Sequence, residues 1–250
     1  MKLAKLHDGP EIFHTIQGEG ISAGLPATFI RASRCNLHCR WCDTDYTWNF
    51  TGTPWPHDHD SRPGYAKYDK SAVTIDLPPE TIAALVRARP PRRVVLTGGE
   101  PLLQQDDWLE IIRLLRADAE PWSFEVETNG TRMPTADFEA AIDQFNISPK
   151  LANSGMPESL RLIPEVLHHL ARSPKAWFKF VASSPADLAE IDSLVARHGI
   201  PADRILLMPE GRTPAELDRH ASLLAAACID RGWRFSDRLH VRLWGDQRGV

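Results

Sequence analysis

Three cysteines, Cys35, Cys39 and Cys42, lie in one short stretch and are followed directly by Asp43 and Thr44. Iron–sulfur clusters are held by cysteine thiolates, and a cubane cluster contains four irons. The spacing Cys-x3-Cys-x2-Cys supplies three thiolates, and no fourth cysteine lies nearby. The stretch therefore predicts a 4Fe–4S cluster with one iron open to a small molecule.

Two other interpretations of the cysteine stretch stay open. Zinc is held by three cysteines and one histidine in some structural sites, and His38 is available as a fourth ligand. Against this, His38 and Cys39 are adjacent, and neighbouring side chains on an extended chain diverge. A redox thiol site is the other possibility, although two cysteines would be enough for it.

A second chemical signal is the turn Thr97-Gly98-Gly99-Glu100-Pro101, which follows the apolar run Val94–Leu96. The glycines allow close approach to a ligand, and Glu100 can accept a hydrogen bond from an ammonium group. Polar turns also end three later strands, at 127–130, 148–150 and 208–211. Active sites of parallel sheets lie at the carboxyl ends of the strands, so we expect these turns to border one common site.

Short β-branched and aromatic runs bounded by turn residues predict seven strands: Thr28–Ala32, Arg93–Thr97, Trp122–Glu127, Gln144–Ser148, Trp177–Ala182, Arg204–Met208 and Leu239–Leu243. Helical patterns alternate with them, which implies parallel pairing through right-handed crossovers. We expect an α/β fold, an open partial β/α barrel of about six units.

Three helices have clear signals. One apolar stripe is formed by Trp108, Ile111, Ile112 and Leu115, and another by Leu188, Ile191 and Val195. Thr213-Pro214-Ala215-Glu216 is a capping box, Ser184-Pro185 is a similar start, and Gly199 and Gly232 suit helix ends. Cys228 continues the stripe of Leu217, Ala221 and Leu224, so we expect it to be a buried thiol rather than a cluster ligand.

Bulk composition is that of an ordinary globular protein, with 42% apolar and 25% charged residues and a formal charge of −4. It gives no basic excess for capturing nucleic acid or an anionic membrane, and we expect a cytoplasmic chain with neither partner. We expect one domain over residues 1–250, with an irregular aromatic and proline-rich insertion at about 45–78 that covers the site. Its histidines, His57 and His59, are expected to be solvent-exposed or merely structural.

Taken together, the motifs resemble the 7-carboxy-7-deazaguanine synthase family of the radical S-adenosylmethionine (SAM) superfamily. The resemblance rests on Thr15–Gly20, Phe29–Arg31, the stretch from Cys35 to Trp48, and Thr97–Pro101. It extends over most of the chain, from about residue 10 to Trp244-Gly245. Gln17-Gly18-Glu19-Gly20 and Cys42-Asp43-Thr44 are specific to the family, whereas the cysteine spacing and Gly-Gly-Glu are shared by the superfamily.

The resemblance implies roles for individual residues. Cys35, Cys39 and Cys42 would hold the cluster, and Thr44 a magnesium ion. SAM would contact Trp41, Asp43, Gly99, Glu100, Ser148, Pro149, Lys150, Met208, Pro209, Glu210 and Gly211. The substrate would contact Ile16, Gln17, Gly18, Glu19 and Thr97. Arg31 would bind the carboxylate of the substrate, and the terminal carboxylate of Val250 would be a further contact.

The implied reaction turns 6-carboxy-5,6,7,8-tetrahydropterin into 7-carboxy-7-deazaguanine with loss of ammonia, a step towards queuosine and other 7-deazapurines. It implies a 4Fe–4S cluster, SAM and Mg²⁺, an external flavodoxin-like electron donor and a homodimer. Two alternatives remain at this point: a radical SAM activase that acts on a partner protein, and a non-enzymatic Cys3His zinc module.

Overall fold

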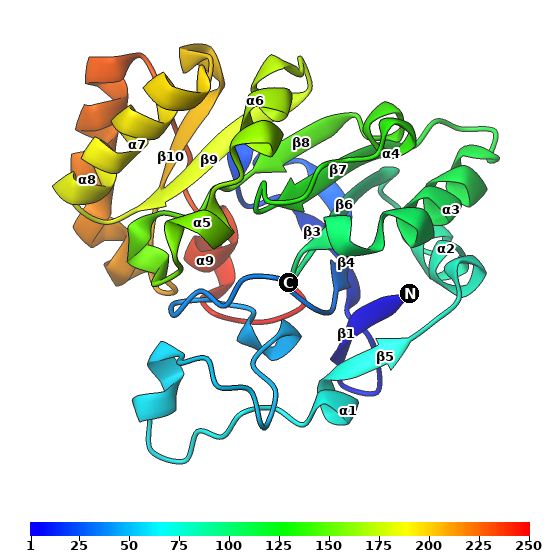
Figure 1. Ribbon diagram of the computed structural model, residues 1–250. Coiled ribbons are helices and arrows are strands. Elements are labelled where there is room, and N and C mark those ends of the chain that lie inside the picture. The colour runs from blue at the N-terminus through cyan, green and yellow to red at the C-terminus, as the bar shows by residue number, and fades with distance from the viewer.

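The computed structural model describes residues 1–250 and is built around one curved sheet whose central strands are parallel (Figure 1). Strands that are consecutive in the parallel part also lie side by side: β4 (Pro26–Ala32), β6 (Arg93–Gly98), β7 (Ser123–Thr128), β8 (Gln144–Ile147), β9 (Ala176–Ala182), β10 (Ile205–Pro209) and β11 (Arg234–Phe235). The sheet does not close, which confirms the predicted open β/α barrel. Six of the seven predicted strands are present, with ends shifted by one or two residues.

An antiparallel extension continues the sheet beside β4 and is absent from the sequence prediction. It consists of β1 (Lys2–Leu6), β2 (Gly9–Pro10) and β3 (Ile12–Ile16) from the start of the chain and β5 (Thr74–Asp76), which pairs with β1. In β3, Phe13 lies opposite Phe29 of β4, and their rings stack with centroids 5.3 Å apart. These strands are short, and their hydrophobic alternation is too brief to be distinctive.

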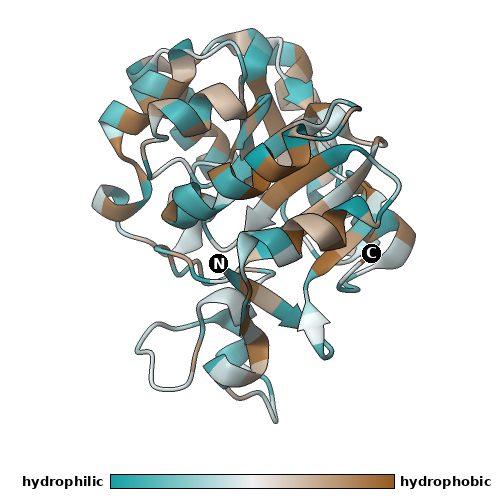
Figure 2. Cartoon of the chain, turned by 90° about the vertical axis from the view of Figure 1, so that its right-hand side faces the viewer, coloured by the Kyte–Doolittle hydropathy of each residue, from teal (hydrophilic) through white to brown (hydrophobic).

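Helices cover the outer face of the sheet and turn their apolar sides towards it (Figure 2). Those that bury apolar side chains in this way are α2 (Pro79–Arg87), α3 (Gln105–Arg116), α4 (Ala136–Ala141), α6 (Pro164–Arg172), α7 (Pro185–His198) and α8 (Pro214–Arg231). The other helices are short: α1 (Lys70–Val73) lies in the insertion, α5 (Glu158–Arg161) is a single turn, and α9 (Leu239–Trp244) borders the cavity through His240. All four stripe residues of α3 are buried, and α7 and α8 begin with the predicted capping boxes. Gly199 and Gly232 end these two helices in the left-handed conformation, and Cys228 is buried.

The predicted strand Leu239–Leu243 is wrong, because these residues form helix α9. Alternation of Leu239, Val241 and Leu243 suggested a strand, but Val241 alone of the three is buried, and Leu243 is 54% exposed. A run of five residues is too short to distinguish the two-residue hydrophobic period of a strand from the 3.6-residue period of a helix.

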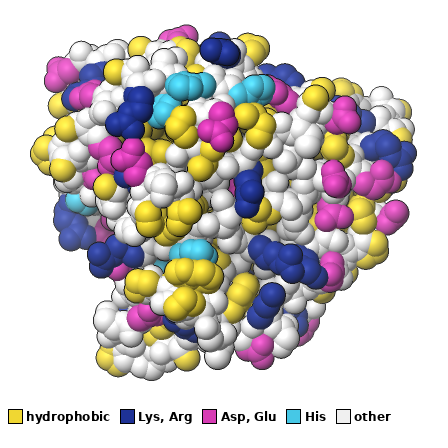
Figure 3. Space-filling model, in the orientation of Figure 1, with side chains coloured by type: hydrophobic (Ala, Val, Ile, Leu, Met, Phe, Trp, Pro, Cys, Tyr) yellow, Lys and Arg dark blue, Asp and Glu magenta, His cyan; other side chains and the backbone are white.

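The segment 45–78 is largely irregular and hangs below the sheet in Figure 1. It contains the 3₁₀ turns Asp45–Thr47 and Asp58–Ser61, followed by α1 and β5. Tyr46 and Trp48 are buried, so the segment packs against the body of the chain. Basic and acidic side chains are interspersed on the face seen in Figure 3. None of the helices combines the length and the apolarity that a membrane span needs.

Candidate active site

The three cysteines follow β4, and all of them line one cavity at the carboxyl ends of the parallel strands. Burial raises the pKa of Cys35 and Cys42, and it raises the pKa of Cys39 to about 12. In the bare loop the thiols are therefore neutral. A positively charged iron centre would supply the charge that converts them to thiolates.

The position of His38 argues against a Cys3His zinc site, which would need this ring as its fourth ligand. His38 does not line the cavity, and its ring stacks on Trp55 with centroids 3.4 Å apart. The donors present thus fit a three-thiolate cluster, and they do not fit a Cys3His zinc site.

The Gly-Gly-Glu turn packs against the start of the cysteine loop. A Cβ atom on Gly99 would lie 1.9 Å from the carbonyl oxygen of Arg34, and Gly98 has a φ of +127°. The backbone N–H of Glu100 donates to this same carbonyl at 2.9 Å. The two glycines therefore allow the end of β6 to pack directly against Arg34, the residue immediately before Cys35.

The side chain of Glu100 does not reach the cavity, contrary to the expected SAM contact. It is fully buried, and its carboxylate accepts from the backbone N–H of Leu102 and of Asn129 and from the Thr128 hydroxyl, at 2.8–3.0 Å. Burial raises the pKa of Glu100. These bonds join the tip of β7 to the Gly-Gly-Glu turn, so Glu100 positions two strand ends.

Most of the predicted SAM contacts do meet in the cavity. Eight of them line it: Trp41, Asp43, Gly99, Ser148, Lys150, Met208, Glu210 and Gly211. The exceptions besides Glu100 are Pro149 and Pro209, which do not line it. The Lys150 ammonium donates to the Ser148 hydroxyl at 3.1 Å and lies 5.6 Å from the centroid of the Trp41 ring. A cation, a hydroxyl and an indole thus come together beside the cysteines.

All seven predicted substrate residues line the same cavity, as does Thr44. Arg31 of β4 lies opposite Thr97 of β6 in the parallel register. Thr97 donates to Glu127 at 2.7 Å, and Gln17 donates to the other oxygen of Glu127 at 3.1 Å. Glu127 ends β7 inside the cavity, but sequence reasoning gave it only a place at a strand tip.

The guanidinium of Arg31 is fixed on one side only. Its Nε donates to Glu11 at 2.9 Å, while its two terminal nitrogens have no partner in the protein. Glu11 is fully buried and also accepts from the Tyr46 hydroxyl at 3.0 Å and from Arg248 at 2.7 Å. The free end of Arg31 can therefore bind a carboxylate in the cavity.

A charged network closes the opposite wall. Glu19 pairs with Lys179 of β9 and with Arg238, whose Nε lies 2.9 Å from the carboxylate. Arg238 also contacts Asp43 at 2.5 Å and donates to the carbonyl of Gly211 at 2.6 Å. Burial alone would raise the pKa of Glu19, but Lys179 and Arg238 lower it well below its ordinary value. Glu19 is therefore ionised and held by two cations.

Three residues of this wall were missed by sequence reasoning: Lys179, Arg238 and His240. Lys179 did leave a signal, because it is the one charged residue in the apolar strand Ala176–Ala182. His240 lies on α9, which was taken for a strand. Its ring fills the space beside Gly18, where a Cβ atom would lie 2.1 Å from Nδ1.

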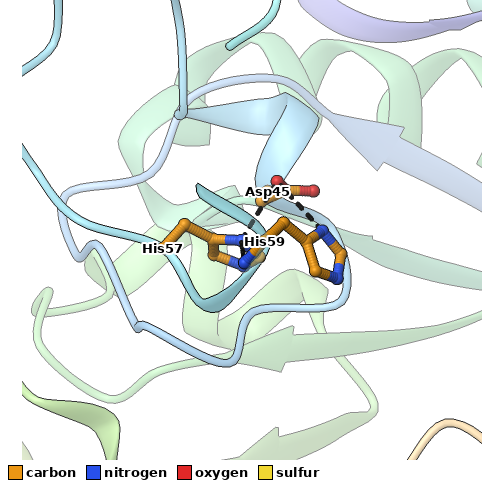
Figure 4. Close-up of side chains that lie close together, drawn as sticks. All are labelled: Asp45, His57 and His59. Carbon is orange, nitrogen blue, oxygen red and sulfur yellow. Dashed lines mark hydrogen bonds and ion pairs between the residues drawn. The ribbon is translucent and has the colours of Figure 1, made fainter. Parts of the chain in front are cut away.

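The insertion brings together Asp45, His57 and His59 (Figure 4). Of the two expectations for the histidines, solvent exposure does not hold, since His57 is 4% and His59 8% exposed, and a structural role remains. His57 Nε2 lies 2.9 Å from the carbonyl oxygen of Cys42, which ties the insertion to the cysteine loop. Arg212 donates to the same carbonyl at 2.5 Å.

Comparison with known proteins agrees with this geometry. Residues 29–224 match the family model described as the radical SAM superfamily. A 7-carboxy-7-deazaguanine synthase of Pyrobaculum aerophilum is 36% identical over 240 residues, which cover 96% of this chain and 95% of the relative. One of Halobacterium salinarum is 34% identical over 265 residues, covering 96% and 93%. The crystal structure of QueE from Escherichia coli superimposes with a TM-score of 0.63 at 27% identity and covers 92% of each chain.

Proposed function

The chain belongs to the radical SAM superfamily and, within it, to the 7-carboxy-7-deazaguanine synthases, and on this premise we propose how its cavity handles 6-carboxy-5,6,7,8-tetrahydropterin. It is a radical SAM enzyme of 7-deazapurine biosynthesis, with a 4Fe–4S cluster and SAM as cofactors. The partner-protein activase and the zinc module are thereby set aside. The observation that carries the proposal is that the three cysteines and Arg31 line one cavity.

When bound, the cluster and SAM supply the hydrogen abstraction that starts the ring contraction of the pterin. The eight SAM candidates that line the cavity would hold SAM beside the cysteines. Arg31 would bind the substrate carboxylate through its two free nitrogens, and Glu127, fixed by Thr97 and Gln17, would accept from N–H groups of the heterocycle. This support would orient the reacting carbon towards SAM.

Magnesium is a further part of the proposal, with Thr44 as its protein ligand. The Thr44 hydroxyl lines the cavity and lies 3.6 Å from the sulfur of Cys42. Magnesium prefers oxygen ligands and binds in part through substrate groups, so Thr44 would hold the ion and the ion would supply positive charge for the pterin carboxylate. The response of activity to added magnesium should weaken in Thr44→Ala and persist in Thr44→Ser; an unchanged response in Thr44→Ala would remove this role.

The decisive experiment is anaerobic reconstitution with SAM, a reductant and 6-carboxy-5,6,7,8-tetrahydropterin, followed by mass spectrometry. We expect 7-carboxy-7-deazaguanine from the wild type and from Cys228→Ala, whose thiol lies in the core. Cys39→Ala should lose both the iron and the product. Product formation by an iron-free Cys39→Ala variant would refute the proposal.

We also propose a single radical SAM domain over residues 1–250, a homodimer, a flavodoxin-like electron donor and a cytoplasmic location. Three exposed large apolar side chains, Phe235, Leu243 and Trp244, lie within ten residues of one another in the sequence and support a protein contact there. Analytical ultracentrifugation should give twice the mass of 28.1 kDa, and a monomer at micromolar concentration would contradict the dimer. Turnover driven by reduced flavodoxin tests the electron donor, and cell fractionation tests the location. A single cooperative unfolding transition is expected if residues 1–250 form one domain.

A further inference from the structure

We propose that Asp45, His57 and His59 bind one divalent transition-metal ion of the zinc type, at a site separate from the cysteine loop (Figure 4). Asp45 directly follows the cysteine loop, and the two histidines come from the irregular part of the insertion. All three are buried. The mechanism proposed above uses none of them.

The spacing of the three ligand atoms suits one ion. Nδ1 of His57 lies 3.5 Å and Nδ1 of His59 lies 3.8 Å from the same oxygen, Oδ2 of Asp45. All three atoms lie within 4.8 Å of one another. Nitrogen and oxygen ligands of tetrahedral zinc are about 2.0–2.2 Å from the metal and hence roughly 3.4 Å apart. The two distances to Asp45 therefore exceed the spacing in a tetrahedral site by only a few tenths of an ångström.

The tautomer of His57 makes Nδ1 an acceptor beside the Asp45 carboxylate. Its Nε2 lies 2.9 Å from the Cys42 carbonyl, which can only accept, so Nε2 carries the hydrogen. Nδ1 is then an acceptor, and in this structure it accepts from the backbone N–H of His59 at 3.1 Å. A cation between Nδ1 of His57 and Oδ2 of Asp45, which lie 3.5 Å apart, would replace this hydrogen bond.

The surroundings of Asp45 resemble the outer shell of a metal site. The hydroxyls of Tyr65 and Tyr68 donate to its two oxygens at 2.6 and 3.3 Å, while no lysine or arginine pairs with it. Asn49, which donates to the Tyr65 hydroxyl, is fully buried, and its own Oδ1 has no partner. Hydrogen bonds of this kind orient metal-binding carboxylates and imidazoles.

The donor set decides the class of ion. Two neutral imidazoles and one carboxylate suit zinc and related divalent transition metals, whereas magnesium and calcium prefer oxygen alone. Through the His57 contact with Cys42, the ion would fix the insertion against the cluster loop.

The test counts metals in the full-length holoenzyme, prepared with four irons per chain so that the cysteines are occupied. The protein is given equimolar zinc sulfate and washed with a chelator, and iron and zinc are then measured by inductively coupled plasma mass spectrometry. We expect about one zinc per wild-type chain. His57→Ala and His59→Ala should retain less than about a tenth of that zinc while keeping their iron. His14→Ala, which removes an exposed histidine of β3 outside the cavity, is the matched control and should keep its zinc.

A wild-type holoenzyme with full iron that takes up no zinc would overturn the proposal, and this outcome depends on no variant. Zinc that stays bound in the His57→Ala/His59→Ala double variant would place the ion elsewhere and overturn it too. Should the alanine variants fold poorly, Asp45→Asn keeps the shape of the side chain and should still lose the zinc. Pterin turnover is measured in parallel, so a failed metal site and a failed enzyme assignment give different results.

Discussion

At the scale of single residues, Arg31 shows how one side chain divides its hydrogen bonds between structure and ligand. Its Nε donates a hydrogen bond to the buried carboxylate of Glu11, and its terminal nitrogens face the cavity. Glu11 keeps its bonds to Tyr46 and Arg248 when Arg31 is absent. Loss of Arg31 should thus weaken substrate binding without unfolding the chain.

We predict that Arg31→Ala raises the Michaelis constant for the pterin roughly 10- to 100-fold, because a hydrogen bond to a charged group contributes about 1.5–3 kcal/mol and about 1.4 kcal/mol is a factor of ten. Arg31→Lys should fall in between, since lysine keeps the charge but lacks the planar fork. Steady-state kinetics with excess SAM measures the effect. Arg113→Ala, an exposed arginine of α3, serves as the control. An unchanged constant in Arg31→Ala would mean that another group holds the carboxylate.

Residue identities alone could locate the cysteines, Arg31 and Thr97, because each lies in a motif with fixed spacing. They could not show that Glu100 turns away from the cavity, since three donors on two other turns decide its direction. Nor could they pair Glu19 with Lys179, which is 160 positions away in the chain. Such contacts depend on the register of distant strands.

At the scale of elements, the close contact of β6 with the cysteine loop is the most demanding local feature. The parallel strands were predictable because each is a short apolar run bounded by turn residues. Strands β1 to β3 and helix α9 were not, because their apolar residues form no distinctive run and their conformation depends on tertiary contacts.

We predict that Gly99→Ala reduces the iron content and destabilises the fold by about 1–3 kcal/mol, the usual cost of forcing extra volume into a packed site. The added methyl group would lie 1.9 Å from the Arg34 carbonyl, so the backbone before Cys35 must move. Iron analysis and denaturant unfolding measure the two effects. In Gly9→Ala the new methyl group meets nothing within 4 Å, and this variant should resemble the wild type. Full iron in Gly99→Ala would show that the loop tolerates the shift.

At the scale of the whole molecule, Arg238 joins segments that are far apart in the sequence. It contacts Glu19 after β3, Asp43 in the cysteine loop and Gly211 after β10. Burial alone would raise the pKa of Asp43, but Arg238 lowers it from 3.8 to about 2. The unfolded chain therefore binds this proton more readily, so the ion pair stabilises the fold above about pH 4 and this stabilisation is lost as the pH falls towards 2.

We predict that Arg238→Gln unfolds at lower urea concentration than the wild type at pH 7, and that the difference shrinks between about pH 4 and pH 2 as the carboxylates are protonated. Urea midpoints of both proteins over this range measure it. Comparison with Arg113→Gln corrects for losing a positive charge on the surface. A difference that does not depend on pH would show that Arg238 acts through packing alone.

The wall formed by residues 236–240 has a consequence for the order of synthesis. The N–H of Leu239 donates to the carbonyl of Gly18 at 2.8 Å, and the Ser236 hydroxyl accepts from the N–H of Gly20 at 2.8 Å, so the last helix completes a wall begun by the first strands. A ribosome translates Cys35, Cys39 and Cys42 about two hundred codons before Arg238. The cavity can therefore close around the cysteines only after residues 236–240 have been made.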